Sequence, residues 1–193
     1  MAQRSRAEGA AGMTTPTLKV EGLELRPTRH ADLGFVRAAE AAPENRDFVG
    51  QWSHEDHARC IASDDCAHFT LFAEGEAPPA GYVILQGLET PDRSLLLRRL
   101  VVTRKGQGVG GRALRAAQRF CFETLGFHRL WLDVHEDNPA RHLYERLGFV
   151  LEGRLRENVK RGEAYLSTLR MSLLDREYRR RADSEGAGAE SGS

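Results

Sequence analysis

The sequence predicts a mixed α/β domain in which a mostly antiparallel sheet of six to seven strands is flanked by helices. Strand-like and helix-like patterns follow one another in the order β-α-α-β-β-β-α-β-α-β-β, which is typical of one sheet covered by helices. A strand, a glycine-rich loop and a helix stand in succession in the middle, and this unit requires one parallel crossover. The 193 residues suffice for a single core without stabilising disulfides or metals. We therefore expect an antiparallel first half and one central βαβ unit.

The elements of the first half are predicted from short apolar or alternating segments and from capping residues. Thr28 has the residue type that begins a helix, and Pro43 ends that helix. The segment EGEAPPA is rich in turn residues and separates two strands, which indicates a hairpin. The predicted strands cover residues 18–26, 68–73 and 81–88, and the predicted helices cover residues 28–42 and 54–63.

The second half is divided by clear helix-ending signals. The helix that follows the glycines runs to Leu125 and is stopped by Gly126. Asn138 and Pro139 form an N-cap and N1 pair for a helix that ends at Gly148. The polar segment ENVKRGE is expected to be a loop between the last two strands. The predicted strands of this half cover residues 94–103, 130–135, 149–151 and 164–173.

Composition indicates one ordered domain, residues 18–178, between two disordered tails. Residues 1–17 and 179–193 are rich in Gly, Ala and Ser and contain few large apolar side chains. The 28 basic and 28 acidic residues balance, so no excess positive field favours nucleic acid or an anionic membrane as a partner. No apolar run approaches the roughly 18 residues of a membrane span, and the first residues do not resemble a secretory signal. We expect a cytoplasmic monomer or homodimer.

The three cysteines, Cys60, Cys66 and Cys121, are odd in number and show neither CxxC nor Cys/His spacing. This pattern argues against a disulfide framework and against a structural zinc site. We therefore expect reduced thiols and no metal.

The most specific local signal is RRLVVTRKGQGVGGR, residues 98–112. A buried strand that runs into clustered glycines and then a helix directs backbone N–H groups toward an anion, typically a phosphate. Arg104 and Lys105 add positive charge. The alternative interpretation is a glycine-rich turn whose role is packing alone.

The same segment also satisfies the dinucleotide fingerprint GxGxxG through Gly106, Gly108 and Gly111. Asp133 lies 22 residues beyond Gly111, near the position of the acidic residue in that fingerprint. A dinucleotide fold needs further parallel βαβ units, whereas one short helix and an antiparallel pair follow Asp133. This architecture disfavours a dinucleotide site.

Two ordered motifs resemble the signatures of the GNAT superfamily of N-acetyltransferases. The segment KGQGVG at 105–110, preceded by the strand LRRLVV, is similar to the family pattern Q/R-x-x-G-x-G/A. The segment ARHLYERLGF at 140–149 is similar to the family pattern A-x-x-L-Y-x-x-x-G-F. The resemblance spans residues 18–173, and the continuation EGRLR looks most like the branch that includes ribosomal-protein N-terminal acetyltransferases.

The resemblance implies a site for acetyl-coenzyme A (acetyl-CoA) as the acetyl donor. In this family the strand before the glycine loop separates from its neighbour and its backbone receives the pantetheine arm, while the loop amides hold the pyrophosphate. The positions that match this donor site are Leu100, Val101 and Val102 on the strand, Lys105, Gly106, Gln107, Gly108, Val109, Gly110, Gly111 and Arg112 around the helix start, and Asn138 and Tyr144 farther along.

The resemblance also assigns the proton transfers. Tyr144 matches the tyrosine that protonates the departing thiolate of coenzyme A, and a phenol with a pKa near 10 can do so at pH 7. Asp133 is the leading candidate for the base that deprotonates the acceptor ammonium, because only a free amine can attack. Its strand places Leu130, Leu132 and Val134 on one face and Trp131, Asp133 and His135 on the other. A carboxylate that pairs with an arginine is the alternative for Asp133, and Glu89, His135 and a water chain remain open as bases.

Two positions depart from the family pattern. Lys105 stands where Gln or Arg is usual, so a point charge replaces a bidentate group. The family places Asn seven residues before the tyrosine, whereas Asn138 is six before Tyr144. Asn138 either caps the helix and still contacts the cofactor through a shorter loop, or that contact is lost.

The resemblance implies a primary amine as the acceptor, either a small molecule or a peptide N-terminus, and the sequence marks the acceptor side of the site less clearly. The residues that the family fold would place there are Glu44, Asn45, Trp52, His54, His57 and the ENVKRGE segment. A tryptophan packed on a hairpin with exposed histidines explains the same residues without an acceptor. A coenzyme A sensor without amine chemistry is the alternative function.

Overall fold

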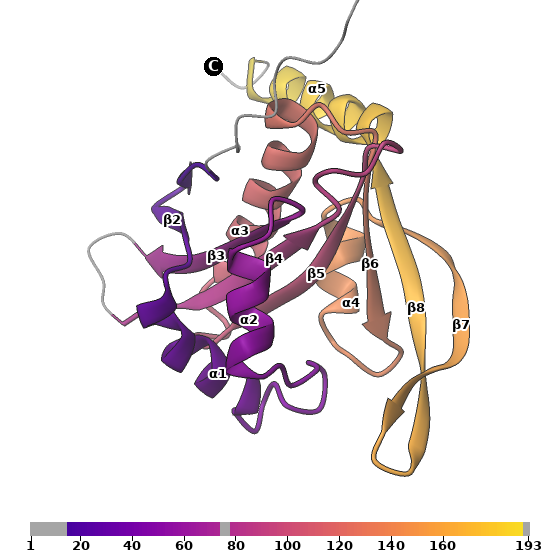
Figure 1. Cartoon of the computed structure of the whole chain (residues 1–193). Helices are drawn as coiled ribbons and strands as arrows, with labels where there is room; N and C mark the ends of the chain where they lie inside the picture. Colours follow the sequence, from indigo (N-terminus) through magenta and orange to yellow (C-terminus); the bar gives the residue numbers. More distant parts are fainter. Residues whose placement is uncertain (1–14, 74–77, 191–193) are drawn as a thin grey trace, which may run out of the picture.

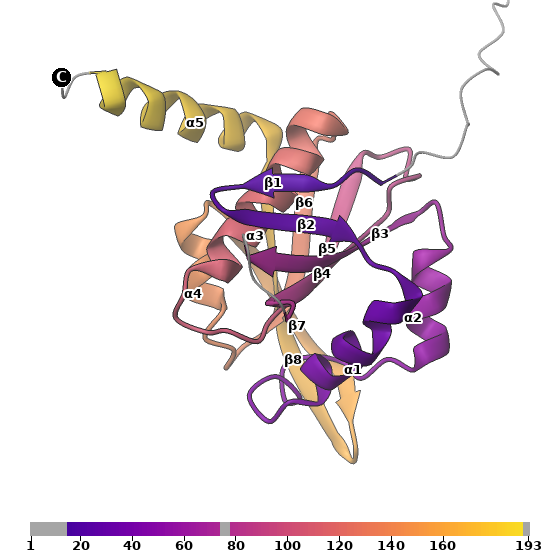
Figure 2. The same ribbon diagram turned by 90° about the vertical axis from the view of Figure 1, so that its left-hand side faces the viewer.

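The computed structural model describes the backbone of residues 15–73 and 78–190 and the side chains as far as residue 184. Within these residues one eight-stranded sheet has the order β1-β2-β3-β4-β5-β6-β8-β7. Helices α1 and α2 cover one face of the sheet, and α3 and α4 cover the other (Figures 1 and 2). Every neighbouring pair is antiparallel except β5 and β6, which are parallel. The predicted mixed fold with one parallel crossover is confirmed.

The strands are β1 (Leu18–Val20), β2 (Leu23–Pro27), β3 (Cys66–Ala73), β4 (Gly81–Gln86), β5 (Ser94–Val102), β6 (Arg129–His135), β7 (Val150–Arg161) and β8 (Ala164–Leu174). The helices are η1 (His30–Asp32), α1 (Leu33–Ala41), α2 (His54–Ile61), α3 (Val109–Arg119), the π-helical turn η2 (Phe120–Thr124), α4 (Arg141–Arg146) and α5 (Asp175–Glu190).

Each face of the sheet has its own apolar core. The larger core joins α3, η2 and α4 to the sheet, and within it Phe69 of β3 meets Phe120 edge to face at 5.8 Å. The smaller core lies under α1 and α2 and includes Val36, Tyr82 and Val101. Side chains that alternate along β5 therefore enter different cores. The central strand is fixed from both sides.

The structure differs from the predicted strand boundaries at two polar segments. One of them is a turn within a predicted strand, and the other is a predicted loop that is largely strand. Residues 18–26 form two strands, β1 and β2, which turn at Glu21 and Gly22 and raise the strand number to eight. Most of the predicted ENVKRGE loop belongs to β7, which continues to Arg161 before a turn at Gly162. The β7–β8 hairpin consequently projects beyond the other strands (Figure 1).

The chain beyond residue 178, expected to be a disordered tail, is helical as α5 through Glu190. The Glu177 carboxylate accepts a hydrogen bond from the backbone N–H of Leu174 at 3.0 Å and so caps the helix start. Tyr178 stacks on Phe122 with ring centroids 4.9 Å apart, which anchors the first turn. Most of the predicted N-terminal tail (residues 1–14) and part of the EGEAPPA turn (residues 74–77) lie outside the described residues.

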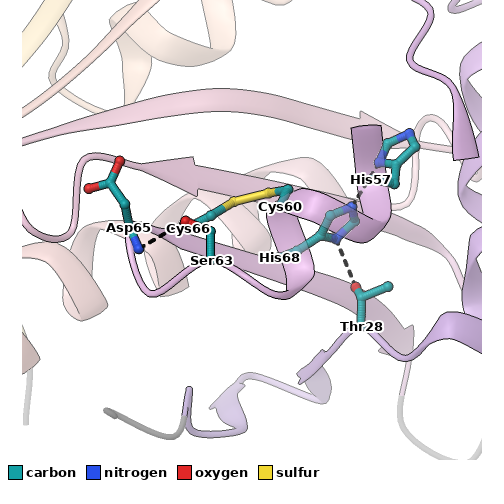
Figure 3. The surroundings of a disulfide bond; sticks show 7 residues. All are labelled: Thr28, His57, Cys60, Ser63, Asp65, Cys66 and His68. Atoms are coloured by element: carbon teal, nitrogen blue, oxygen red, sulfur yellow. Dashed lines mark hydrogen bonds between the residues drawn. A yellow bond between two sulfur atoms is a disulfide. The ribbon is translucent and has the colours of Figure 1, made fainter. Parts of the chain in front are cut away.

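The prediction of three reduced thiols is wrong for two of them. Cys60 in α2 and Cys66 at the start of β3 form a disulfide with a Cα–Cα distance of 5.6 Å (Figure 3). A tight turn between helix and strand brings them together, with the N–H of Cys66 donating to the carbonyl of Ser63. A search for CxxC spacing misses this pair. Cys121 is unpaired and buried, and burial raises the pKa of its thiol.

Over the described ranges, no helix is long and apolar enough to cross a membrane. The same residues contain no group of three or more His, Cys, Asp or Glu side chains placed to hold a metal ion.

Candidate active site

The parallel strands β5 and β6 separate after a short paired stretch. Their register joins only Ser94–Leu96 to Arg129–Trp131 among the described residues. Beyond this point β6 continues along β8, with which it pairs over its full length. The divergence is visible between β5 and β6 in Figure 1. It leaves one backbone edge of β5 without a strand partner.

The open edge of β5 presents the backbone groups of Leu100 and Val102. The N–H of Thr103 donates to the carbonyl of Ala80 at 3.0 Å, on the β4 side. Backbone groups of a strand alternate between its two sides, so the N–H of Val101 also points toward β4. The N–H groups of Leu100 and Val102 then point into the opening. Of the three strand residues assigned to the donor site, these two have amides available to a ligand there.

The glycine loop after β5 forms a cradle of backbone amides. Gly106 and Gly108 have positive φ angles of 81° and 70°, a conformation that favours glycine. Apart from the adjacent residues of the chain, no described atom lies within 4 Å of where a Cβ would stand at either position. Helix α3 begins at Val109, and the N–H of Arg112 donates to the carbonyl of Gly108. The earlier amides of the first turn have no acceptor within the helix and carry its positive dipole end, which suits a phosphate.

Two basic side chains hold this loop in place. The Lys105 ammonium donates to the carbonyl of Glu44 at 2.8 Å. The Arg112 guanidinium donates to the carbonyls of Glu21 at 2.8 Å and Gln107 at 3.4 Å. These contacts tie the cradle to the α1–α2 connection and to the β1–β2 turn. A direct phosphate contact by Lys105 stays a prediction.

We expect Gly108→Val to raise the Kd for acetyl-CoA by about 10-fold or more. A β-branched residue with positive φ is strained by about 1–3 kcal/mol, and relief of that strain would turn the amides of the cradle away from the pyrophosphate. Titration calorimetry measures the change. Gly126→Val is the matched control, because Gly126 also has positive φ and open space around its Cβ position but ends a different segment. Equal losses of affinity in both variants would contradict a binding role for the loop.

The Asn138 side chain accepts a hydrogen bond from the N–H of Ala140 at 2.9 Å and so closes the turn before α4. The prediction that Asn138 is the N-cap and Pro139 the first helical residue is wrong, because α4 begins at Arg141 and its N-cap is Ala140.

Helix α4, which carries Tyr144, packs against the start of α3. A Cβ on Gly110 would lie 3.4 Å from the side chain of Leu143, which shows how closely α3 and α4 approach each other. Tyr144 follows Leu143 and is only 8% exposed. Burial raises its pKa to about 12, so the phenol keeps its proton at neutral pH.

Asp133 lies on the β6 face that points away from the larger core, as predicted. Leu130, Leu132 and Val134 are buried on the core side. Both carboxylate oxygens of Asp133 are engaged by the Arg170 guanidinium, at 2.9 and 2.8 Å. The alternative of an arginine-paired carboxylate therefore describes its geometry.

The other candidate bases differ in position. The Nε2 atom of His135 lies 3.2 Å from the Arg161 guanidinium and accepts its hydrogen bond, which places the imidazole proton on Nδ1. Burial and the charge of Arg161 lower the pKa of His135, so the ring is neutral at pH 7. Arg161 also donates to the carbonyl of Asp47 and thereby joins the hairpin to the α1–α2 connection. Glu89, whose N–H donates to Asp65, lies on the connection that precedes β5, at its paired end.

A model of the acetyltransferase (GNAT) family matches residues 38–149, more than half of the chain. The chain belongs to the GNAT acetyltransferase family. It is therefore an acetyl-CoA-dependent N-acetyltransferase that acts on amines. The dinucleotide alternative fails on topology as well, because β7 and β8 are antiparallel.

Relatives of this acetyltransferase include named polyamine enzymes. It is 25% identical over 168 residues to spermidine N(1)-acetyltransferase of Escherichia coli K12, covering 81% of this chain and 88% of that one. Its identity to the Vibrio cholerae enzyme of the same name is 26% over 172 residues, covering 83% and 98%. The fold matches the crystal structure of Vibrio cholerae spermidine N-acetyltransferase in complex with CoA and spermine, with a TM-score of 0.73 at 24% identity over 81% and 98% of the two chains. These comparisons support the family and do not single out the ribosomal-protein branch.

Two of the residues expected on the acceptor side of this acetyltransferase are structural instead. The Asn45 amide is buried and donates to the carbonyl of Ala39 at 2.9 Å. His57, expected to be exposed, is fully buried, and its Nδ1 lies 3.1 Å from Nε2 of His68 (Figure 3). Trp52 remains at the surface as a half-buried side chain. Glu44 and His54 are exposed.

Sequence reasoning missed a buried ionic network centred on Glu40 of α1, which is 1% exposed. Its carboxylate accepts hydrogen bonds from Tyr82 at 2.6 Å, from the backbone N–H of Trp52 at 3.0 Å and from Arg99. Nε2 of His57 lies 3.2 Å from the same carboxylate. Burial raises the pKa of Glu40, but these partners outweigh burial and the net pKa is lowered. A glutamate on the apolar stripe of α1 was the available signal.

Proposed function

We propose that this acetyltransferase moves the acetyl group from acetyl-CoA directly to a primary amine while both substrates are bound. The separation of β5 from β6 carries the proposal. The glycine loop, which we propose binds the pyrophosphate, lies at the end of β5, and a polar face of β6 lies beside the opening. A donor thioester held in the opening can therefore meet an amine without a covalent enzyme intermediate.

The residues of the opening have distinct roles in this proposal. Leu100 and Val102 are two residues apart on the same strand edge, about 7 Å at the usual rise of a strand. One of their amides therefore donates to the thioester carbonyl and to the oxyanion that forms when the amine attacks, and the other donates to the pantetheine arm. An oxyanion donor contributes about 3 kcal/mol of transition-state stabilisation. Tyr144 gives its proton to the departing thiolate. The amides from Gln107 to Arg112 hold the pyrophosphate.

We propose that Asp133 receives the proton of the acceptor ammonium through a bridging water. The Arg170 guanidinium donates one hydrogen bond to each carboxylate oxygen of Asp133. Each oxygen can accept a further hydrogen bond, which leaves room for the water. A carboxylate at this point also attracts the ammonium group to the opening.

The class of amine that serves as acceptor can be found by comparing the rates of acetylation of different amines. The relatives named above act on spermidine according to their names, so polyamines and diamines belong in any acceptor panel. Peptide N-termini belong in the panel because of the EGRLR resemblance. A cytoplasmic location and a monomeric or homodimeric state remain part of the proposal.

The test combines binding with turnover. Titration calorimetry with acetyl-CoA is expected to give saturable micromolar binding, while NAD titrated separately gives none. Coenzyme A release is then measured with and without amines, and amine-dependent release above hydrolysis is the expected result. Tight binding of acetyl-CoA without any amine-dependent release would contradict the proposal and favour the sensor alternative.

A further inference from the structure

Arg98 stands on an irregularity of β5, at the point where this strand leaves β6. The register with β4 pairs Arg99 with Ile84 and Leu97 with Leu85, so Arg98 is the extra residue of a β-bulge. The pairing of β5 with β6 ends two residues earlier, at Leu96. Bulges redirect side chains and are common beside active sites. The bulge therefore presents Arg98 at the mouth of the opening.

The surroundings of Arg98 leave its guanidinium available. The side chain is exposed, and its guanidinium carbon lies 5.9 Å from the ring centroid of Trp52. Within the described part of the chain no hydrogen bond or ion pair engages this guanidinium. Partial desolvation by its neighbours and the charge of Arg99 lower the pKa of Arg98, while the charge of Asp133 raises it, so Arg98 and Asp133 lie within electrostatic range. Arg99, in contrast, is buried and paired with Glu40.

The mouth of the opening carries more positive than negative charge. Arg98, Arg161 and Arg170 contribute three guanidinium groups from β5, β7 and β8. Against them stand Asp133, which Arg170 already engages, and Asp137, whose charge reaches His135. The charge of Glu152 also reaches Arg170, but Glu152 is paired with Arg129. A dication would meet net repulsion here. An acceptor with an anionic group would be attracted.

An anion at Arg98 is distinct from the phosphates of the donor. Val102 lies four residues farther along β5, which is about 13 Å at the usual rise of a strand. The phosphate-binding loop begins only beyond that residue. The anion that suits Arg98 must therefore come from the acceptor.

We infer that Arg98 binds a carboxylate of the acceptor and that the enzyme prefers amines that carry one. The planar fork of a guanidinium matches a carboxylate with two parallel hydrogen bonds. Asp133 and Arg98 then attract the two ends of a dipolar acceptor, with the ammonium toward Asp133 and the carboxylate toward Arg98. This inference rests on the proposed amine acetylation and names its substrate class.

Matched acceptors test the inference. Each ω-amino acid with three to six carbons is compared with its ω-amino amide and with the corresponding diamine, and kcat/KM is measured for each. The amides of the dipeptides Ser-Glu and Ser-Gln extend the comparison to N-terminal amines. We expect the carboxylate to be preferred over its amide by about 10- to 100-fold, the range for hydrogen bonds to charged groups. In Arg98→Gln the ratio is expected to fall close to one.

Arg176→Gln is the control variant, because Arg176 is an exposed arginine on α5 and its loss changes the net charge equally. The ratio of carboxylate to amide should stay unchanged there. The same ratio of kcat/KM values, carboxylate over amide, is compared between the unmodified enzyme and each variant. Differences in basicity between the amines affect all of these proteins equally and therefore cancel. A preference for diamines, or a carboxylate preference that survives Arg98→Gln, would overturn the inference while leaving amine acetylation intact. Absence of turnover with every acceptor would instead overturn the proposed function.

Discussion

Replacing Tyr144 with phenylalanine is expected to lower kcat for acetyl transfer by about 100-fold or more, the usual effect of removing a general acid. Tyr144 is buried and its pKa is raised to about 12, so at neutral pH the phenol is protonated and able to donate. Phenylalanine keeps the ring and its edge contact with Phe149 at 5.8 Å. The affinity for acetyl-CoA, measured by calorimetry, should therefore stay within about twofold.

A matched control separates chemistry from packing. Tyr165 of β8 is 58% exposed, and Tyr165→Phe removes the same hydroxyl from a side chain that faces solvent. Its kcat should equal that of the unmodified enzyme. Full activity in Tyr144→Phe would remove Tyr144 from the reaction. A loss of acetyl-CoA affinity that matches the loss of kcat would assign the tyrosine to binding instead.

The conformation of the glycine loop and the start of α3 could be predicted because their signals are local in sequence. Gly106 and Gly108 need positive φ, and the strand before them must be apolar to reach the core. Asn138 needs only the N–H of Ala140, two residues along the chain, to close its turn. Each of these constraints involves residues a few positions apart. A sequence pattern records such constraints directly.

The acceptor side could not be predicted in the same way, because it depends on partners from distant elements. Nothing in the segment RRLVV distinguishes Arg98 from Arg99, and only the register with β4 shows that Arg98 lies in a bulge. Asp133 meets Arg170, which is 37 residues away. The Cys60–Cys66 disulfide depends on the turn that follows α2. In each case the contact partner, and not the residue type, decides the role.

Replacing Glu40 with alanine is expected to lower the free energy of unfolding by about 3–5 kcal/mol, as is typical when one partner of a buried ion pair is removed. The change leaves the buried guanidinium of Arg99 without its carboxylate and the hydroxyl of Tyr82 without its acceptor. Urea unfolding followed by circular dichroism measures the loss. Glu24→Ala is the control, because Glu24 pairs with Lys19 and Arg26 on an exposed part of the sheet, where such pairs contribute little.

A double variant distinguishes charge from packing in this network. Replacing both partners with apolar residues, Glu40→Leu with Arg99→Met, removes the uncompensated charge and keeps most of the buried volume. It should therefore be more stable than Glu40→Ala. A double variant as unstable as the single one would show that the remaining partners of Glu40, which are Trp52, His57 and Tyr82, carry the stabilisation. Trp52 also lies next to Arg98. That outcome would therefore mean that the contacts that stabilise the α1 face also hold a residue of the acceptor side in position.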